Sequence, residues 1–237
     1  MKKLPTINAQ YWAFIISATT LGETGGDLIS QSLHLGYAGA SILLIALFII
    51  ALLIELKTAI QHPLLYWLVI ILASLAGTTI SDFVTRTLGL GYGWGSLLVA
   101  TVLVVIFYCW HKMTKHVSVQ SAFNVKTECL YWTAILASST LGTAFGDYIA
   151  NATPLGFGGG ALLLMSLLVI IMFLALLTQI SREIFYWLAI IITHPMGAAL
   201  GDFMTKPEGI NLGNVPASAI LLVIFVLIMF SFRTKQM

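Results

Sequence analysis

Charged side chains are scarce in this chain: Asp, Glu, Lys and Arg make up 8% of its 237 residues, while 59% are hydrophobic. Soluble domains carry about 25% charged residues, so this chain could not cover a water-facing surface. The net charge of +2 is small and its charges are dispersed, which argues against nucleic acid as a partner. Cys109 and Cys129 have no CxxC spacing, so we expect neither a disulfide framework nor a thiolate metal site.

Long apolar segments, in contrast, follow one another along the whole chain. About 20 apolar residues in a helix cross the hydrocarbon core of a bilayer, and the gaps between segments are too short for a soluble domain. The first segment has no A-x-A-like cleavage site, so it is interpreted as a retained helix rather than a signal peptide. We therefore predict one all-α transmembrane domain, residues 1–237, whose eight helices span about 9–31, 38–57, 64–86, 94–112, 129–151, 159–180, 184–206 and 216–233.

Four tandem copies of one two-helix unit account for these segments. The copies span about residues 9–57, 64–112, 129–180 and 184–233. Each carries a tryptophan, a glycine ten residues later and an aspartate fifteen residues after the tryptophan. The tryptophans are Trp12, Trp67, Trp132 and Trp187, the glycines are Gly22, Gly77, Gly142 and Gly197, and the aspartates are Asp27, Asp82, Asp147 and Asp202. The second helix of each copy follows LGY, LGY, LGF or INL, at 35–37, 90–92, 155–157 and 210–212.

Lysine and arginine placement predicts how the helices are oriented, because cytoplasmic loops of membrane proteins are rich in both. Nine of these residues fall on one side of the predicted bundle: Lys2, Lys3, Lys57, Lys112, Lys115, Lys126, Arg182, Arg233 and Lys235. Only Arg86 and Lys206 fall on the other side. We expect both termini in the cytoplasm and all four copies in one orientation. The tryptophans would then lie at the cytoplasmic interface, with the aspartates ~22 Å further along each helix.

The registered residues Trp12-x9-Gly22-x4-Asp27 and their three equivalents, fullest in TTLGETGGD at 19–27, carry a family resemblance. The chain resembles the bacterial integral membrane proteins built of four tandem two-helix repeats of unknown function, a family of uncharacterised membrane-anchored proteins. The resemblance covers essentially the whole chain. It implies a multi-pass protein of the bacterial inner membrane and says little about activity.

Polar residues precede each aspartate at spacings that place them on its helix face, since residues three and four apart are neighbours. Ile15, Ile16, Ile70 and Ile71 make the other half of the face apolar, so we predict a vestibule or half-channel that opens outward. The polar residues are Thr19, Thr20, Glu23 and Thr24 in the first copy, Ser74, Thr78 and Thr79 in the second, Ser139, Thr140 and Thr143 in the third, and His194 in the fourth.

A separate ridge of small residues includes Gly22, Gly77, Gly142 and Gly197, and such ridges allow close helix packing in lipid. Packing is therefore the simpler role for these glycines. An inner bundle of the first, third, fifth and seventh helices would bring the four aspartates around one axis. The remaining four helices lack ionisable groups at mid-membrane and would form the outer ring.

Carboxylates within a bilayer are costly, so each is a candidate functional group. Arg86 and Lys206 lie one turn beyond Asp82 and Asp202, which predicts intrahelical ion pairs there. Glu23, Asp27 and Asp147 have no such neighbour, and they are the predicted metal ligands. All-oxygen sites suit hard cations such as Mn²⁺, Mg²⁺, Ca²⁺ or Na⁺. The predicted cation-binding residues are Asp27, Asp147, Glu23, Thr20, Thr24, Thr140 and Thr143, with Asp82, Asp202 and His194 as secondary candidates; His194 would join a metal site, relay protons or simply be hydrogen-bonded.

The leading hypothesis is a transporter, either an exporter or an exchanger, for a small hard cation such as Mn²⁺ or Mg²⁺, with proton competition for the carboxylates. No resident cofactor is expected; the divalent cation would be the substrate, the lipid bilayer the other partner, and homo-oligomerisation is left open. The first alternative is an organic-cation carrier or sensor, with Phe83 or Phe145 lining a larger cavity. An intramembrane enzyme has no HExxH or GxSxG motif to support it. A structural membrane subunit would leave the acids without a role.

Overall fold

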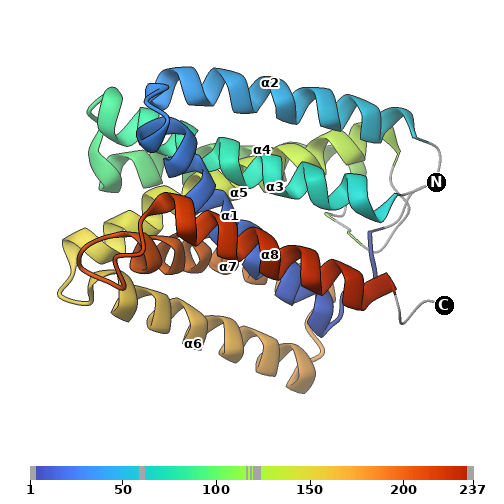
Figure 1. Ribbon diagram of the computed structural model, residues 1–237. Coiled ribbons are helices and arrows are strands. Elements are labelled where there is room, and N and C mark those ends of the chain that lie inside the picture. The colour runs from blue at the N-terminus through green and yellow to red at the C-terminus, as the bar shows by residue number, and fades with distance from the viewer. Residues whose placement is uncertain (1–3, 59–61, 116, 118, 120–123, 234–237) are drawn as a thin grey trace.

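The computed structural model describes residues 4–58, 62–115, 117, 119 and 124–233, and for 231–233 the backbone alone. The described residues form eight α-helices and no strand, which confirms the all-α prediction (Figure 1). Two π-helical turns, η1 (Leu28–Ser32) and η2 (Phe83–Thr87), continue the first and third helices. The helices are α1 (Ala9–Asp27), α2 (Gly36–Lys57), α3 (Pro63–Asp82), α4 (Gly91–Thr114), α5 (Val125–Ala152), α6 (Gly156–Leu177), α7 (Arg182–Thr205) and α8 (Asn214–Arg233).

Local sequence explains where the helices begin. Asn8 caps α1 by accepting a hydrogen bond from the Tyr11 N–H at 2.9 Å, and Asn124 with Thr127 forms a capping box at α5. The LGY and LGF motifs place Gly36, Gly91 and Gly156 at φ values of 68°, 71° and 61°, a left-handed conformation that suits glycine. In the fourth copy Asn211 of INL takes this conformation at φ 60°, since asparagine also tolerates it. These residues turn the chain from each inner helix into its outer helix.

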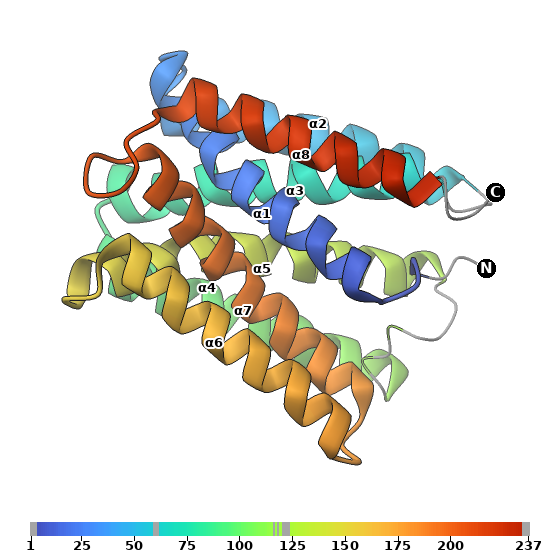
Figure 2. The same ribbon diagram turned by 60° about the horizontal axis from the view of Figure 1, so that its bottom comes forward.

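The inner helices α1, α3, α5 and α7 form a closed four-membered ring, in which each packs against the next and α7 packs against α1. The outer helices cover this ring: α2 packs against α3, α4 against α5, α6 against α7, and α8 against α1 (Figures 1 and 2). Each copy therefore places its outer helix mainly on the inner helix of the next copy. The predicted division into inner and outer helices is correct. Because each outer helix packs on the inner helix of the next copy, every copy is linked to its neighbour.

The outer surface of the bundle is apolar. Among the described residues, α2, α4, α6, α7 and the continuous segment Pro63–Thr87 are long and apolar enough to cross a membrane. α1 and α5 carry the polar stripe, which faces the bundle interior and lowers their overall hydrophobicity. Large apolar side chains such as Ile50, Val104 and Phe173 are exposed on α2, α4 and α6. The protein is therefore an all-α membrane protein whose polar groups are buried inside the bundle.

The four registered glycines mark the closest contacts between inner helices. A Cβ atom added to Gly142 would lie 2.7 Å from the backbone carbonyl carbon of His194, closer than real Cβ contacts allow. The same clash recurs around the ring between equivalent positions, which are Gly22 with Ser74, Gly77 with Ser139, Gly142 with His194, and Gly197 with Thr19. The packing role predicted for these glycines is present in all four copies.

The tryptophans lie elsewhere than expected. Trp67, Trp132 and Trp187 are buried in the bundle core, where they do not form an aromatic belt facing lipid. Each packs against the tyrosine that precedes the tryptophan of the previous copy, with ring centroids 5.3–5.8 Å apart. For these three tryptophans the expectation of a lipid-interface role is wrong, because their helix faces turn toward a neighbouring inner helix; Trp12 is only partly buried. Of the basic residues used to orient the chain, Lys2, Lys3 and Lys235 lie outside the described residues.

We expect Gly142→Ala to lower the stability of the bundle by about 1–3 kcal/mol, because the added methyl group would push α5 away from α7. The measurement is the thermal unfolding midpoint of the detergent-purified protein. Gly39→Ala in α2 is the matched control, since the nearest atom to its new methyl group lies at 3.9 Å. Equal midpoints for the two variants would contradict the assignment of Gly142 to a close helix contact.

Candidate cation-binding site

The bundle axis is lined by residues that recur every fourth position of each inner helix. Counted from the tryptophan, they stand at positions −1, +3, +7, +11 and +15. Equivalent residues of the four copies form successive layers: tyrosine, isoleucine, a mixed polar layer, a layer containing Glu23, and aspartate. We call the end of the bundle with the tyrosines the terminal end, because α1 begins and α8 ends there, and the other the acidic end (Figure 2).

The tyrosine layer is a closed ring of hydroxyl groups at the terminal end. The Oη–Oη distances around it are 3.0 Å for Tyr11–Tyr66, 2.7 Å for Tyr66–Tyr131, 2.9 Å for Tyr131–Tyr186 and 2.8 Å for Tyr186–Tyr11. Four hydroxyls can each donate one hydrogen bond and accept one, so the ring satisfies buried groups without water. The sequence interpretation missed this ring, although the dipeptide Tyr-Trp recurs in all four copies and could have revealed it.

An apolar layer separates the tyrosines from the acids. It consists of one isoleucine from each inner helix, all at most 1% exposed: Ile15, Ile70, Ile135 and Ile190. The next layer contains Thr19, Ser74, Ser139 and His194, the residues that meet the glycines. The isoleucines form an apolar layer without polar side chains at this level of the axis.

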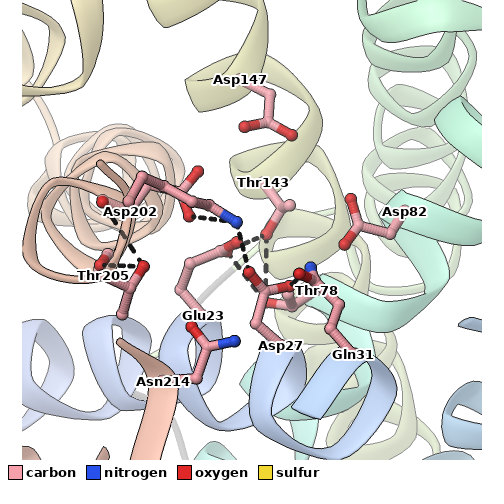
Figure 3. Close-up of polar contacts among 12 residues, drawn as sticks. Glu23, Asp27, Gln31, Thr78, Asp82, Thr143, Asp147, Asp202, Thr205 and Asn214 are labelled. Atoms are coloured by element: carbon pink, nitrogen blue, oxygen red, sulfur yellow. Dashed lines mark hydrogen bonds and ion pairs between the residues drawn. The ribbon is translucent and has the colours of Figure 1, made fainter. Parts of the chain in front are cut away.

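Glu23 is the one acidic residue of the next layer. Its Oε2 atom accepts hydrogen bonds from the hydroxyls of Thr143 at 2.7 Å and Thr78 at 3.1 Å (Figure 3). These threonines are the residues equivalent to Glu23 in the second and third copies, and Ala198 holds the position in the fourth. Glu23 therefore reaches across the axis and is held by two other inner helices.

Arg86 joins two aspartates from adjacent copies. Its Nε atom lies 2.7 Å from Asp82 Oδ1, as the one-turn spacing predicted, and its Nη2 lies 2.9 Å from Asp147 Oδ2. The guanidinium also lies near the rings of Tyr37 and Tyr92, at 5.9 and 5.6 Å from their centroids. Arg86 is thus held on several sides by α2, α4 and the two aspartates.

Lys206 makes the equivalent bridge on the opposite side of the ring. Its Nζ lies 3.3 Å from Asp202 Oδ1, its predicted partner, and 2.6 Å from Asp27 Oδ2 in the first copy. Asp27 Oδ1 also accepts a hydrogen bond from Gln31. Asp27 and Asp147 have no basic residue one turn beyond them in their own helices, but both are paired with a base from another helix. Their partners belong to the neighbouring copy, which the spacing within one helix does not reveal.

Three acids come close enough to share one cation. Glu23, Asp27 and Asp202 each offer an oxygen, and these oxygens lie within 4.8 Å of one another (Figure 3). Oxygens on opposite sides of a hard cation are about 4–5 Å apart, given ligand distances of ~2.0–2.6 Å. The predicted set of Glu23, Asp27 and Asp147 is corrected here: α1 adjoins α7 in the ring, so Asp202 takes the place given to Asp147.

Several predicted oxygen ligands bond elsewhere. The hydroxyls of Thr20 and Thr140 donate to helix carbonyls of their own helices, and Thr24 accepts from Ser218 of α8. Only Thr143 of the four predicted threonines contacts an acid, and Thr78, which the predicted site omitted, does the same. His194 Nδ1 lies 2.9 Å from the Ile190 carbonyl oxygen, and the histidine is outside the three-acid group.

The cluster carries more acids than bases. Five carboxyl groups, Glu23 and the four aspartates, face two bases, so full ionisation would leave an excess of three negative charges. All five acids are at most 4% exposed, which also means that the polar stripe is closed in this structure rather than an open vestibule. Asp82 Oδ2 is buried and has no hydrogen-bond partner. The carboxylates in excess of the two bases must take up protons or cations, because a bare buried charge is too costly.

The repeat was compared with known families. The chain matches the family described as Repeat of Unknown Function (DUF347) four times, over residues 10–61, 65–116, 130–181 and 185–236. The chain belongs to this family. The boundaries of the four matches lie within a few residues of those of the predicted copies. The family description does not indicate an activity. No curated protein and no solved structure matches the chain.

We expect Tyr66→Phe to destabilise this DUF347 protein by about 1–3 kcal/mol, because Tyr11 and Tyr131 would each lose a hydroxyl partner in a buried setting. Thermal unfolding in detergent measures the loss. Tyr108→Phe is the control, since Tyr108 is 60% exposed on α4. A midpoint unchanged from wild type in Tyr66→Phe would show that the hydroxyl ring adds nothing to stability.

Proposed function

We propose that this protein transports a small hard cation, such as Mn²⁺ or Mg²⁺, across the bacterial inner membrane. The observation that carries the proposal is the close approach of Glu23, Asp27 and Asp202, whose oxygens lie within 4.8 Å in a buried cluster with surplus negative charge. Carboxylate oxygens are the ligands that such ions prefer. A cation held there would neutralise the negative charge that the two bases leave unbalanced.

A proton can serve the same purpose as the cation at these carboxylates. The surplus of acids means that cation binding would release protons from the cluster, and proton uptake would release the cation. This competition supplies a route to exchange of the cation against protons. Both export and import are compatible with it. The placement of basic residues favours termini in the cytoplasm, which puts the acidic end toward the outside of the cell.

A transporter must also block free ion flow, and the terminal half of the axis meets this need. The isoleucine layer and the tyrosine hydroxyl ring close the route from the acids to the terminal end. The transported ion would pass only when the inner helices shift and open these two layers. At the contacts between inner helices the glycine itself has no side chain, so only the partner residue would have to move past it.

The organic-cation alternative has less support from the geometry. The three acids converge too closely to surround a bulky cation, and Phe145, expected to line a cavity, stacks against Tyr148 with centroids 6.4 Å apart. A cavity of about 530 Å³ does exist near Trp12, Phe185 and Tyr186, yet it is at the terminal end and includes the positively charged Arg182. We therefore favour transport of a monatomic cation that binds at the acidic end.

Asp27→Asn and Glu23→Gln should each weaken Mn²⁺ binding by more than about tenfold and abolish Mn²⁺ flux, because each removes a charged ligand. Binding is measured by calorimetry on protein in lipid nanodiscs, and flux by quenching of a trapped dye in proteoliposomes. Glu208→Gln, on an exposed turn at the same end, is the charge-matched control. Wild-type flux in both site variants would refute the proposal, and flux of tetraethylammonium instead of Mn²⁺ would favour the organic-cation alternative.

Ile135→Ser should make proteoliposomes leak cations and protons, because it puts a hydroxyl into the apolar layer that separates the acids from the terminal end. The leak is read as decay of an imposed pH gradient in the absence of Mn²⁺. Ile170→Ser, on the exposed face of α6, controls for the same change of side chain. If the two variants hold the gradient equally well, the isoleucine layer is not the barrier.

A further inference from the structure

The two basic bridges of the acidic end are equivalent in position but differ in how firmly they are held. Arg86 contacts two aspartates and lies over two tyrosine rings. Lys206 contacts two aspartates, and no aromatic ring holds its ammonium group in the described residues. Lys206 follows the last residue of α7, Thr205, and begins the turn that leads to α8. Its side chain is 21% exposed and that of Arg86 is 32% exposed, so the two bridges differ in their contacts rather than in their exposure.

The ammonium group of Lys206 also contacts the three-acid group itself. Its two partners, Asp27 and Asp202, are two of the three acids whose oxygens converge within 4.8 Å. The cluster therefore already holds a cation, which is attached to the protein. Arg86 binds Asp82 and Asp147, neither of which belongs to the three-acid group.

We propose that Lys206 is a tethered competitor of the transported cation: its ammonium group fills the three-acid site when the site is empty and leaves when the cation binds. This inference rests on the proposed function and adds the residue that sets affinity at the same site. A second positive charge cannot share two carboxylates with Lys206 at close range without strong repulsion. Return of Lys206 to Asp27 and Asp202 would then expel the ion. Lys206 therefore keeps the site from holding its substrate too tightly to release it.

The flexible side chain of Lys206 and the turn that follows α7 are consistent with this exchange of Lys206 for the cation. Lys206 has a flexible stem and a compact charge, whereas the planar guanidinium of Arg86 suits a fixed bridge. The backbone near Lys206 is anchored by hydrogen bonds from Lys206 N to Asp202 O and from Ile210 N to Phe203 O. The side chain can therefore swing away from Asp27 and Asp202 without unfolding α7.

Lys206→Gln should bind Mn²⁺ at least about tenfold more tightly than wild type, because the competing charge is gone. Its Mn²⁺ turnover in proteoliposomes should fall, because nothing expels the ion. Affinity is measured by calorimetry with Mn²⁺ on protein in nanodiscs of neutral lipid. Arg86→Gln is the matched control, since it removes one positive charge from the bridge outside the three-acid group. Lys112→Gln, remote from the acids, serves as the charge control if Arg86→Gln does not fold.

A second measurement detects the displacement of Lys206 from the acids in the wild-type protein. Saturating Mn²⁺ should increase the acylation rate of Lys206 by an amine reagent several-fold, as quantified by mass spectrometry, and leave that of Lys112 unchanged. If Mn²⁺ binds the wild type in an Asp27-dependent manner but neither Lys206 reactivity nor the Lys206→Gln affinity changes, the tether is refuted and the transport proposal stands. Equal tightening in Arg86→Gln also refutes it. If neither wild type nor Lys206→Gln binds Mn²⁺, the proposed function itself fails.

Discussion

The rest of the bundle depends on five carboxyl groups that are buried at one end of the inner helical ring. Among the described residues, two bases balance them. Lipid offers no water to solvate such groups, so the protein must surround them with its own polar atoms. The outer helices keep lipid away from the ring, and the glycines bring the inner helices close enough for the acids of adjacent copies to share bases. The surplus of negative charge that remains is the observation behind the proposal that this end binds a cation.

The four copies are alike in backbone and unlike in chemistry. Every copy supplies a tyrosine to the hydroxyl ring and an isoleucine to the apolar layer, so the terminal half of the axis is nearly fourfold symmetric. At the acidic end Glu23 has no acidic counterpart, and the bases occur only in the second and fourth copies. Because each base bridges to the following copy, the acidic end has twofold character with one additional acid. That acid selects the side of the ring where three carboxylates converge.

This arrangement separates a barrier from a binding site along one axis. The tyrosine and isoleucine layers contain no charge and are closed by hydrogen bonds and packing, whereas the acidic layers hold the charge that the proposed function would exchange. Repeats in one orientation produce this polarity directly, since each layer is built from the same position in every copy. The copies differ most at the acidic layers, where we propose that the ion binds.

The repeat spacing by itself determined the four two-helix units, the inner and outer helices, the close glycine contacts and the pairing of Asp82 with Arg86 and Asp202 with Lys206, because each of these follows from periodicity along one helix or one unit. The tertiary structure alone decided the partners of Asp27, Asp147 and Glu23, which are 179, 61 and 55 or 120 residues away in the chain. It also decided that Asp202 joins Glu23 and Asp27. Such contacts depend on which helices adjoin in the ring and how they are rotated, and neither property is encoded in the spacing of a single helix.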